Sequence, residues 1–163
     1  MPLSDQFPAD PYVILDPAIR WYPGDQLLGD VGREKLIPPL VEKVRRGVKA
    51  WRDKDYAGAS DTTRALLRWW FSEQHLVPQA DGTMAAFRWY FAQREAVESA
   101  IWLYEVEQAR EPYALMTKYD SSQALWRQMF DEDWARYVMK LATGAGKTKV
   151  MSLLMTWSYF HKL

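Results

Sequence analysis

The stretch Leu141-Ala142-Thr143-Gly144-Ala145-Gly146-Lys147-Thr148 decides the fold expected of this chain. Its two glycines allow the backbone to curl so that successive N–H groups point at one anion. The lysine that follows suits the β and γ phosphates of a nucleotide, and the threonine hydroxyl suits a magnesium ion. We therefore expect a phosphate-binding loop made of Thr143, Gly144, Ala145, Gly146, Lys147 and Thr148, in which Thr148 also helps to hold Mg²⁺.

Both flanks of the loop fit that expectation. Residues 137–141 form a short run with a β-branched and an aromatic residue, which predicts a buried strand. Residues 148–162 contain neither Gly nor Pro and predict a helix of about four turns. A strand, a glycine loop and a helix N-terminus in this order bring a helix dipole and free N–H groups to an anion. Leu141 stands where the strict motif has glycine, so the match is to a variant ending in Thr-Gly-x-Gly-Lys-Thr.

The composition excludes several kinds of protein. Lys and Arg together number 21, as do Asp and Glu, so no global basic field attracts nucleic acid. A local patch at Lys43, Arg45 and Arg46 is either a contact for DNA phosphates or a solvated face. Cysteine is absent, which excludes a disulfide framework and a cysteine-based zinc site. The first residues lack a signal-like pattern and no apolar segment is long enough to cross a bilayer, so we expect a cytoplasmic protein without membrane contact.

The rest of the chain predicts helices around a tryptophan-rich core. Residues 1–35 are rich in Pro, Gly and Asp, which predicts an irregular arm with an extended piece at 12–15. Helices are predicted from Pro38-Pro39 to Trp51, from Ser60 or Asp61 to Phe71, over about 84–108, and, after a loop at 112–122, up to Phe130. Most of the nine tryptophans lie at helical spacing among aliphatic residues, and we interpret them as core. The expected fold class is mixed and predominantly α-helical.

A second part of a nucleotide site is predicted at Gln93, in the third of these helices. An amide side chain offers a donor and an acceptor together, which is the pair needed to read an adenine edge. Phe87 or Phe91 would lie against the base. An exposed glutamine on an amphipathic helix is the alternative that these residues leave open.

Gln93-Arg94-Glu95-Ala96-Val97-Glu98, followed by Lys140-Leu141 and the loop up to Thr148, resembles the start of a superfamily-2 helicase-like motor. The two stretches look most like the restriction (Res) subunits of type III restriction enzymes and related DEAD/DEAH-box-like proteins. The resemblance implies that Gln93 contacts adenine, that Gly144 to Lys147 wrap the phosphates, and that Thr148 helps to hold Mg²⁺. It also implies ATP and Mg²⁺ as cofactors, double-stranded DNA as a partner of the parent protein, and room for a modification subunit.

The same resemblance divides the chain into two parts. Residues 1–83 look like an N-terminal extension, made of the arm and helices, and residues 84–163 look like the start of a RecA-like ATP-binding domain. The family's acidic motif II, its arginine-bearing motif VI, its second RecA-like domain and its nuclease domain would follow Leu163. The chain thus resembles the N-terminal slice of a longer motor. We expect it to contact the adenine and phosphates of ATP without hydrolysing ATP or cutting DNA, and we assign no catalytic residue.

Two other functions stay open on the sequence alone. A different P-loop enzyme, such as a small kinase, would need an acidic partner for Mg²⁺ beyond the loop, yet residues 149–163 contain no Asp or Glu. A non-enzymatic helical interaction module with a vestigial loop is the other. Independently of function, the final helix is apolar around nearly its whole circumference. We expect it to pack on the tryptophan-rich helices or to pair with another copy, so that any apolar patch left open promotes self-association.

Overall fold

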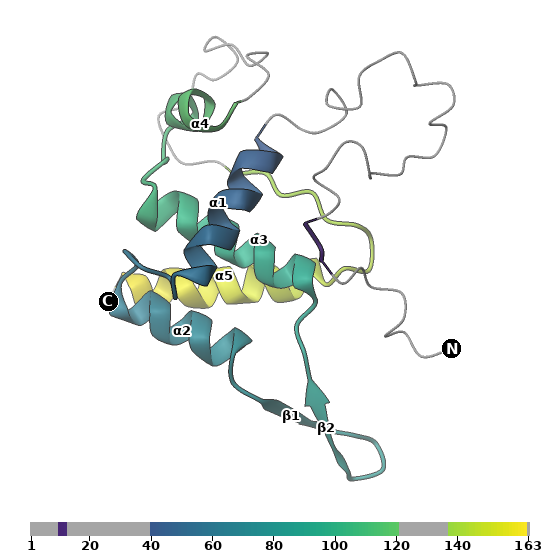
Figure 1. Ribbon diagram of the computed structural model, residues 1–163. Coiled ribbons are helices and arrows are strands. Elements are labelled where there is room, and N and C mark those ends of the chain that lie inside the picture. The colour runs from purple at the N-terminus through teal and green to yellow at the C-terminus, as the bar shows by residue number, and fades with distance from the viewer. Residues whose placement is uncertain (1–9, 13–39, 121–136, 163) are drawn as a thin grey trace, which may run out of the picture.

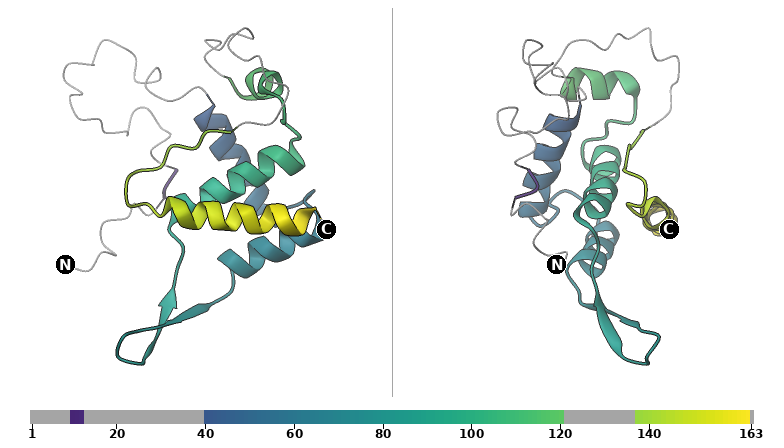
Figure 2. Two further views of the ribbon diagram at one scale, coloured as in Figure 1. Left: turned by 180° about the vertical axis from the view of Figure 1, so that it is seen from behind. Right: turned by 90° about the vertical axis from the view of Figure 1, so that its right-hand side faces the viewer.

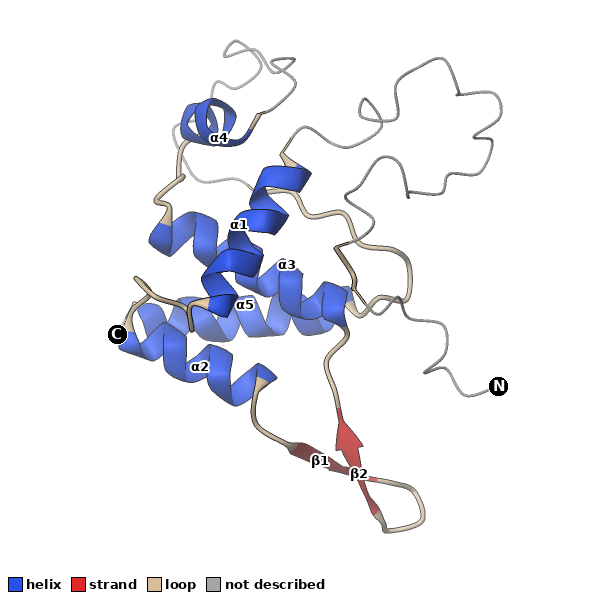
Figure 3. Cartoon of the chain, in the orientation of Figure 1, coloured by secondary structure: helices blue, strands red, loops and turns tan. Residues whose placement is uncertain are grey.

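The computed structural model describes residues 10–12, 40–120 and 137–162. Within them the chain forms five α-helices, one π-helical turn and one antiparallel pair of strands (Figures 1 and 3). The helices are α1 (Val41–Asp53), α2 (Asp61–Phe71), α3 (Phe91–Ile101), α4 (Pro112–Tyr119) and α5 (Lys147–His161), and the strands are β1 (His75–Pro78) and β2 (Met84–Phe87). The predominantly helical class predicted from the sequence is confirmed.

Helix α3 lies in the middle of the helical body, between α1 and α5 (Figure 2). Helix α5 also packs against α2, so the last described helix covers two earlier ones. The centre of the core consists of fully buried aliphatic side chains from α1, α2 and α3, namely Val48, Leu67, Val97 and Ile101. Burying each of these side chains contributes about 1.5–3 kcal/mol, and α3 supplies two of the four.

The tryptophans mostly surround this centre, as the sequence predicted. The buried ones among the described residues are Trp51, Trp70, Trp102 and Trp157. Trp69 is 58% exposed on the outer face of α2 and does not belong to the core. A Cβ at Gly47 in α1 would overlap with the ring of Trp102, so this glycine lets the indole lie directly against the α1 backbone.

Residues 75–87 form a β-hairpin where the sequence analysis expected a break and the start of a long helix. Strands β1 and β2 pair with Pro78 opposite Met84, and the hairpin projects from the helical body (Figure 1). The carboxylate of Asp81 accepts hydrogen bonds from the N–H and the hydroxyl of Thr83, and Gly82 adopts a φ of 82°. Asp-Gly between two short apolar runs favours a hairpin, and here it outweighs the helix propensity of the alanines in β2.

Helix α3 therefore begins at Phe91, and the continuous helix predicted over 84–108 is wrong. The backbone of Tyr90 is extended, and its N–H donates to the side chain of Gln93 at the third helical position. A glutamine at that position caps the first turn of a helix by bonding back to the residue before it. Beyond Ile101 the helix widens into a π-helical turn, η5, over Trp102–Val106.

Helix α2 begins at the predicted cap. The hydroxyl of Ser60 accepts the N–H of Thr63 at 3.2 Å, which satisfies one of the free amides of the first turn. Glu105 in η5 accepts the N–H of Ser60 at 2.5 Å and the hydroxyl of Thr63 at 2.6 Å. The indole N–H of Trp157 in α5 donates to that same hydroxyl at 2.8 Å. The fully buried Thr63 thus joins α2, η5 and α5.

Residues 112–119 form α4, where the sequence analysis expected a loop. Pro112 stands in the first turn, where its missing N–H removes no helical hydrogen bond. A proline after a helix marks its end, and the same residue also suits the start of the next helix. The short helix predicted up to Phe130 falls outside the described residues.

Residues 137–141 do not form the strand predicted for them. Tyr137, Met139 and Leu141 pack against the core while Val138 is 89% exposed, which is the alternation of a strand. In the described part of the chain, however, no strand lies beside this segment, so its backbone forms no ladder. Apart from Tyr12, the extended piece predicted at 12–15 lies outside the described residues.

Helix α5 confirms the helix predicted after the loop, and it packs on the tryptophan-rich helices as expected. Val150, Leu153 and Trp157 are buried against the body. A second row of apolar side chains stays exposed on its outer face, made of Met151, Met155, Tyr159 and Phe160.

Candidate functional site

The glycine loop turns sharply before α5. Gly144 has a φ of 79° and Gly146 a φ of 77°, both in the left-handed region that favours glycine. The N–H of Ala145 donates to the carbonyl oxygen of Ala142 at 3.2 Å, which closes a tight turn between them. Gly146 is then the residue that precedes the first turn of α5. The positive φ angles explain why both of these positions in the predicted motif are glycine.

The N-terminus of α5 offers free donors to an anion. No side chain caps this end, and the first amides bonded within the helix are those of Lys149 and Val150, which donate to Gly146. The N–H groups of Lys147 and Thr148 precede them and have no intrahelical acceptor. These amides carry the positive end of the helix dipole, so the exposed loop suits a phosphate.

The side chain of Lys147 bonds back to the start of this loop. Its ammonium group donates to the carbonyl oxygen of Ala142 at 3.0 Å. Both Lys147 and Thr148 are exposed, so their side chains are accessible to a ligand. The next lysine, Lys149, turns away, and its ammonium lies 4.2 Å from the ring centre of Phe87 at the base of the hairpin.

Gln93 contacts the loop directly, although 52 residues separate it from Ala145. Its side-chain nitrogen donates to the carbonyl oxygen of Ala145 at 2.9 Å, and its side-chain oxygen accepts the N–H of Tyr90 at 3.1 Å. A Cβ at Gly146 would overlap with the same nitrogen. The two sequence motifs therefore meet in the fold, with Gln93 only 2% exposed between α3 and the loop.

The two phenylalanines suggested for the base lie on different sides of α3's first turn. Phe87 packs edge-on against Trp89 and faces Lys149. Phe91 packs edge-on against Tyr12, with the guanidinium of Arg45 5.8 Å from its ring centre. Neither ring is free of protein partners in this arrangement.

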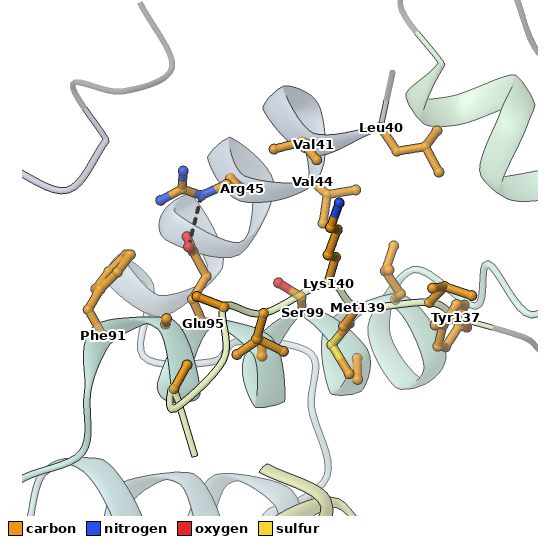
Figure 4. Close-up of a pocket in the computed structure, with 18 of the residues that line it drawn as sticks. Leu40, Val41, Val44, Arg45, Phe91, Glu95, Ser99, Tyr137, Met139 and Lys140 are labelled. Carbon is orange, nitrogen blue, oxygen red and sulfur yellow. Dashed lines mark hydrogen bonds and ion pairs between the residues drawn. The ribbon is translucent and has the colours of Figure 1, made fainter. Parts of the chain in front are cut away.

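A cavity of about 530 Å³ lies next to the loop, between α1, α3 and residues 137–142 (Figure 4). Its lining is mostly apolar, and Ala142 and Ala145 of the loop form part of its wall. Glu95 extends from α3 toward Arg45 on α1, and the two form an ion pair of 2.8 Å. The other carboxylate oxygen of Glu95 is buried without a partner among the described residues. Burial raises the pKa of Glu95, while Arg45 and Tyr12 act in the opposite direction.

A buried ion cluster behind the cavity fixes α3 to α1, and the sequence analysis missed it. Glu98 is fully buried and pairs with Arg52 of α1 and with Arg94 of its own helix. The hydroxyl of Tyr56 donates to the same carboxylate at 2.7 Å. Burial, reinforced by the charge of Glu98, raises the pKa of Tyr56 to about 12. The sequence signal for this cluster is the pair Glu95 and Glu98, two carboxylates three residues apart that share one face of a largely apolar helix.

The basic residues of α1 are largely neutralised by neighbours. Arg45 pairs with Glu95, and Arg46 pairs with Glu42 one turn earlier. Lys43 is exposed. Of the two alternatives for these residues, the pairs favour a solvated face over a contact for DNA phosphates.

Two further features are absent from the described ranges. They contain no group of three His, Cys, Asp or Glu side chains placed to hold a metal ion. Their helices also lack the combination of length and apolar character that crossing a bilayer requires.

Comparison with known proteins leaves this site to be judged on its geometry. No family model, no curated protein and no solved structure matches the chain.

Proposed function

We propose that this chain binds ATP with Mg²⁺ through residues 143–148, as the nucleotide-binding part of a helicase-type or translocase-type restriction protein. One observation carries the proposal: Gln93 and the glycine loop, the two motifs behind the resemblance, are in hydrogen-bond contact across 52 residues. Left-handed glycines and an uncapped helix N-terminus support it independently.

The residues of the loop fit a nucleotide polyphosphate. The amides of the first turn of α5 point at one place, and Lys147 can exchange its bond to Ala142 for a phosphate oxygen. The hydroxyl of Thr148 suits a Mg²⁺ ion that arrives with the nucleotide and neutralises phosphate charge. Double-stranded DNA and a modification subunit belong to this proposal as partners of the parent protein, and a cytoplasmic location accords with a cysteine-free chain.

We propose that residues 143–148 hold the nucleotide and do not themselves catalyse its hydrolysis. Phosphoryl transfer requires an acidic residue on the metal and a cation on the transferred group, in addition to the loop. Residues 149–163 offer no carboxylate on the helix that leaves the loop. We therefore assign these residues to holding the nucleotide and assign no catalytic role to any of them.

The test is a titration of the chain with a fluorescent ATP analogue in the presence of Mg²⁺. Lys147→Ala is expected to weaken binding by about 10- to 100-fold, because a hydrogen bond to a charged group is worth about 1.5–3 kcal/mol. Lys54→Ala removes an equally exposed charge at the far end of α1 and is expected to leave the affinity unchanged. A flat titration of the unaltered chain would refute the proposal. ATP turnover that disappears with Lys147→Ala would refute its non-hydrolytic part alone.

A non-enzymatic interaction module is the second candidate, and one observation favours it. Met151, Met155 and Tyr159 follow one another at intervals of one turn on the outer face of α5, and each is more than 60% exposed. Such a row promotes association in water. Light scattering is expected to show an apparent mass that rises with concentration and falls with Met155→Lys. The same change at Met84, which is similarly exposed on the hairpin, serves as the control; equal effects of both would contradict a role for α5.

A further inference from the structure

Gln93 is buried between α3 and the glycine loop, and both ends of its amide are bonded to protein. Its side chain is 2% exposed, so no ligand reaches its amide in this arrangement. Its nitrogen already donates to Ala145, and its oxygen already accepts from Tyr90. An amide has one more N–H and one more lone pair, but both are enclosed here by protein.

The contacts of Gln93 connect the phosphate loop to the helix that carries the buried ion cluster. The glutamine stands in the first turn of α3, and the same helix carries the buried Glu98 that is held by two arginines and a tyrosine hydroxyl. On its other side the amide touches Ala145 and Gly146, the two residues that orient the start of α5. A shift of Gln93 would therefore release the loop from a fixed support.

We propose that Gln93 is a positioning residue, which holds Ala145 and Gly146 of the phosphate loop in their anion-binding shape and does not read the nucleotide base. This inference rests on the proposed nucleotide-binding function and deepens it. Gln93 then contributes to the affinity for the polyphosphate, and its contribution is the same for any ligand that carries a polyphosphate.

The first experiment compares three ligands with Mg²⁺: ATP, GTP and inorganic triphosphate, the last of which has no base. Gln93→Ala and Gln93→Met are expected to weaken all three by the same factor, about three- to tenfold, which is the net value of one lost hydrogen bond. Gln93→Met keeps the length of the side chain and lacks its polar atoms. Gln79→Ala, an exposed glutamine at the hairpin turn, is the matched control and is expected to change none of the affinities.

The second experiment is hydrogen exchange without any ligand, which separates loop positioning from nucleotide binding. Gln93→Met is expected to speed exchange at residues 144–148, while α2 exchanges as in the unaltered chain. Thr63→Val, which destabilises the opposite end of α5, controls for a general loss of stability: it is expected to leave the loop's exchange and the three affinities unchanged under conditions where the chain is folded.

The outcomes are distinguishable. A loss confined to ATP, with GTP and triphosphate unaffected, would overturn the inference and identify Gln93 as a reader of adenine. Unchanged affinities or unchanged loop exchange in Gln93→Met would also overturn it. If the unaltered chain binds none of the three ligands, the proposed function fails, and the exchange experiment alone decides whether Gln93 holds the loop.

Discussion

Replacing Gly146 with alanine is expected to destabilise the chain for two reasons, one in the backbone and one in the packing of Gln93. An alanine held at a φ of 77° is destabilised by about 1–2 kcal/mol, because its Cβ approaches the following carbonyl oxygen. The new Cβ would also overlap with the side-chain nitrogen of Gln93 and would displace that amide from its two hydrogen bonds. Each lost bond is worth about 0.5–1.5 kcal/mol, so we expect a total loss of about 2–5 kcal/mol in the free energy of unfolding.

Gly144→Ala is the matched control for the backbone cost. Gly144 has a φ of 79°, and a Cβ there would meet nothing within 4 Å. Its substitution is therefore expected to cost only about 1–2 kcal/mol. Urea unfolding, followed by circular dichroism and by tryptophan fluorescence, measures both values under the same conditions.

A double-mutant cycle tests the role of Gln93 in this difference. In a Gln93→Ala background the overlap disappears, so Gly146→Ala is expected to cost no more than Gly144→Ala does. The coupling free energy between the two sites should then be about 1–3 kcal/mol. Each single mutant loses the two hydrogen bonds of Gln93, whereas the double mutant loses them only once. Strictly additive costs, or equal costs at the two glycines in the unaltered background, would refute the reasoning.

Three further changes are predicted to affect stability in defined directions. Gly47→Ala is expected to destabilise the chain by about 1–3 kcal/mol in thermal unfolding, because the Cβ would overlap with Trp102. Helix propensity alone predicts a gain in stability of about 1 kcal/mol, so a higher melting temperature would contradict this packing. Thr63→Val should cost about 1–3 kcal/mol in urea unfolding, since the indole N–H of Trp157 loses its acceptor and Glu105 loses one of its donors, and a neutral change would show that both find other partners. Tyr56 ionises at pH 10 when unfolded and at about 12 when folded, so its contribution is complete below pH 10 and is lost as the pH rises to 12. Unfolding free energy should thus fall by about 2 kcal/mol more between pH 10 and 12 in the unaltered chain than in Tyr56→Phe, and parallel pH profiles would show that burial and the charge of Glu98 do not raise the pKa of Tyr56.

The parts of this molecule that the sequence predicted correctly are those with local physical signals. Ser60 caps α2 because a serine before an apolar helical pattern satisfies the first free amides. Helix α5 was predictable from a Gly-free and Pro-free apolar run after Gly146. The meeting of Gln93 with the loop was predictable only through a resemblance, since nothing local relates residues 52 apart.

The errors arose where a local signal had two meanings or where the partner was distant. Asp81-Gly82 lies just before the helix predicted from residue 84, although such a pair also favours a turn between two strands. The glutamine at position 93 was a capping signal for a helix that starts at Phe91, but no serine or threonine stands at residue 90 to complete the usual pattern. Residues 137–142 have the alternation of a strand, and only a neighbouring strand would have made them one.

The order in which the ribosome makes this chain has a consequence for Thr63. Its partner Trp157 comes 94 residues later, which corresponds to a delay of about 5–20 s at ordinary rates of synthesis. During that interval α2 and α3 exist without the helix that covers them, so the nascent chain offers apolar surface to chaperones or to other nascent chains. The phosphate loop emerges just before its own helix docks. A ligand that binds residues 143–148 can therefore stabilise the fold only after this segment has been made, by an amount set by the ligand concentration relative to its Kd.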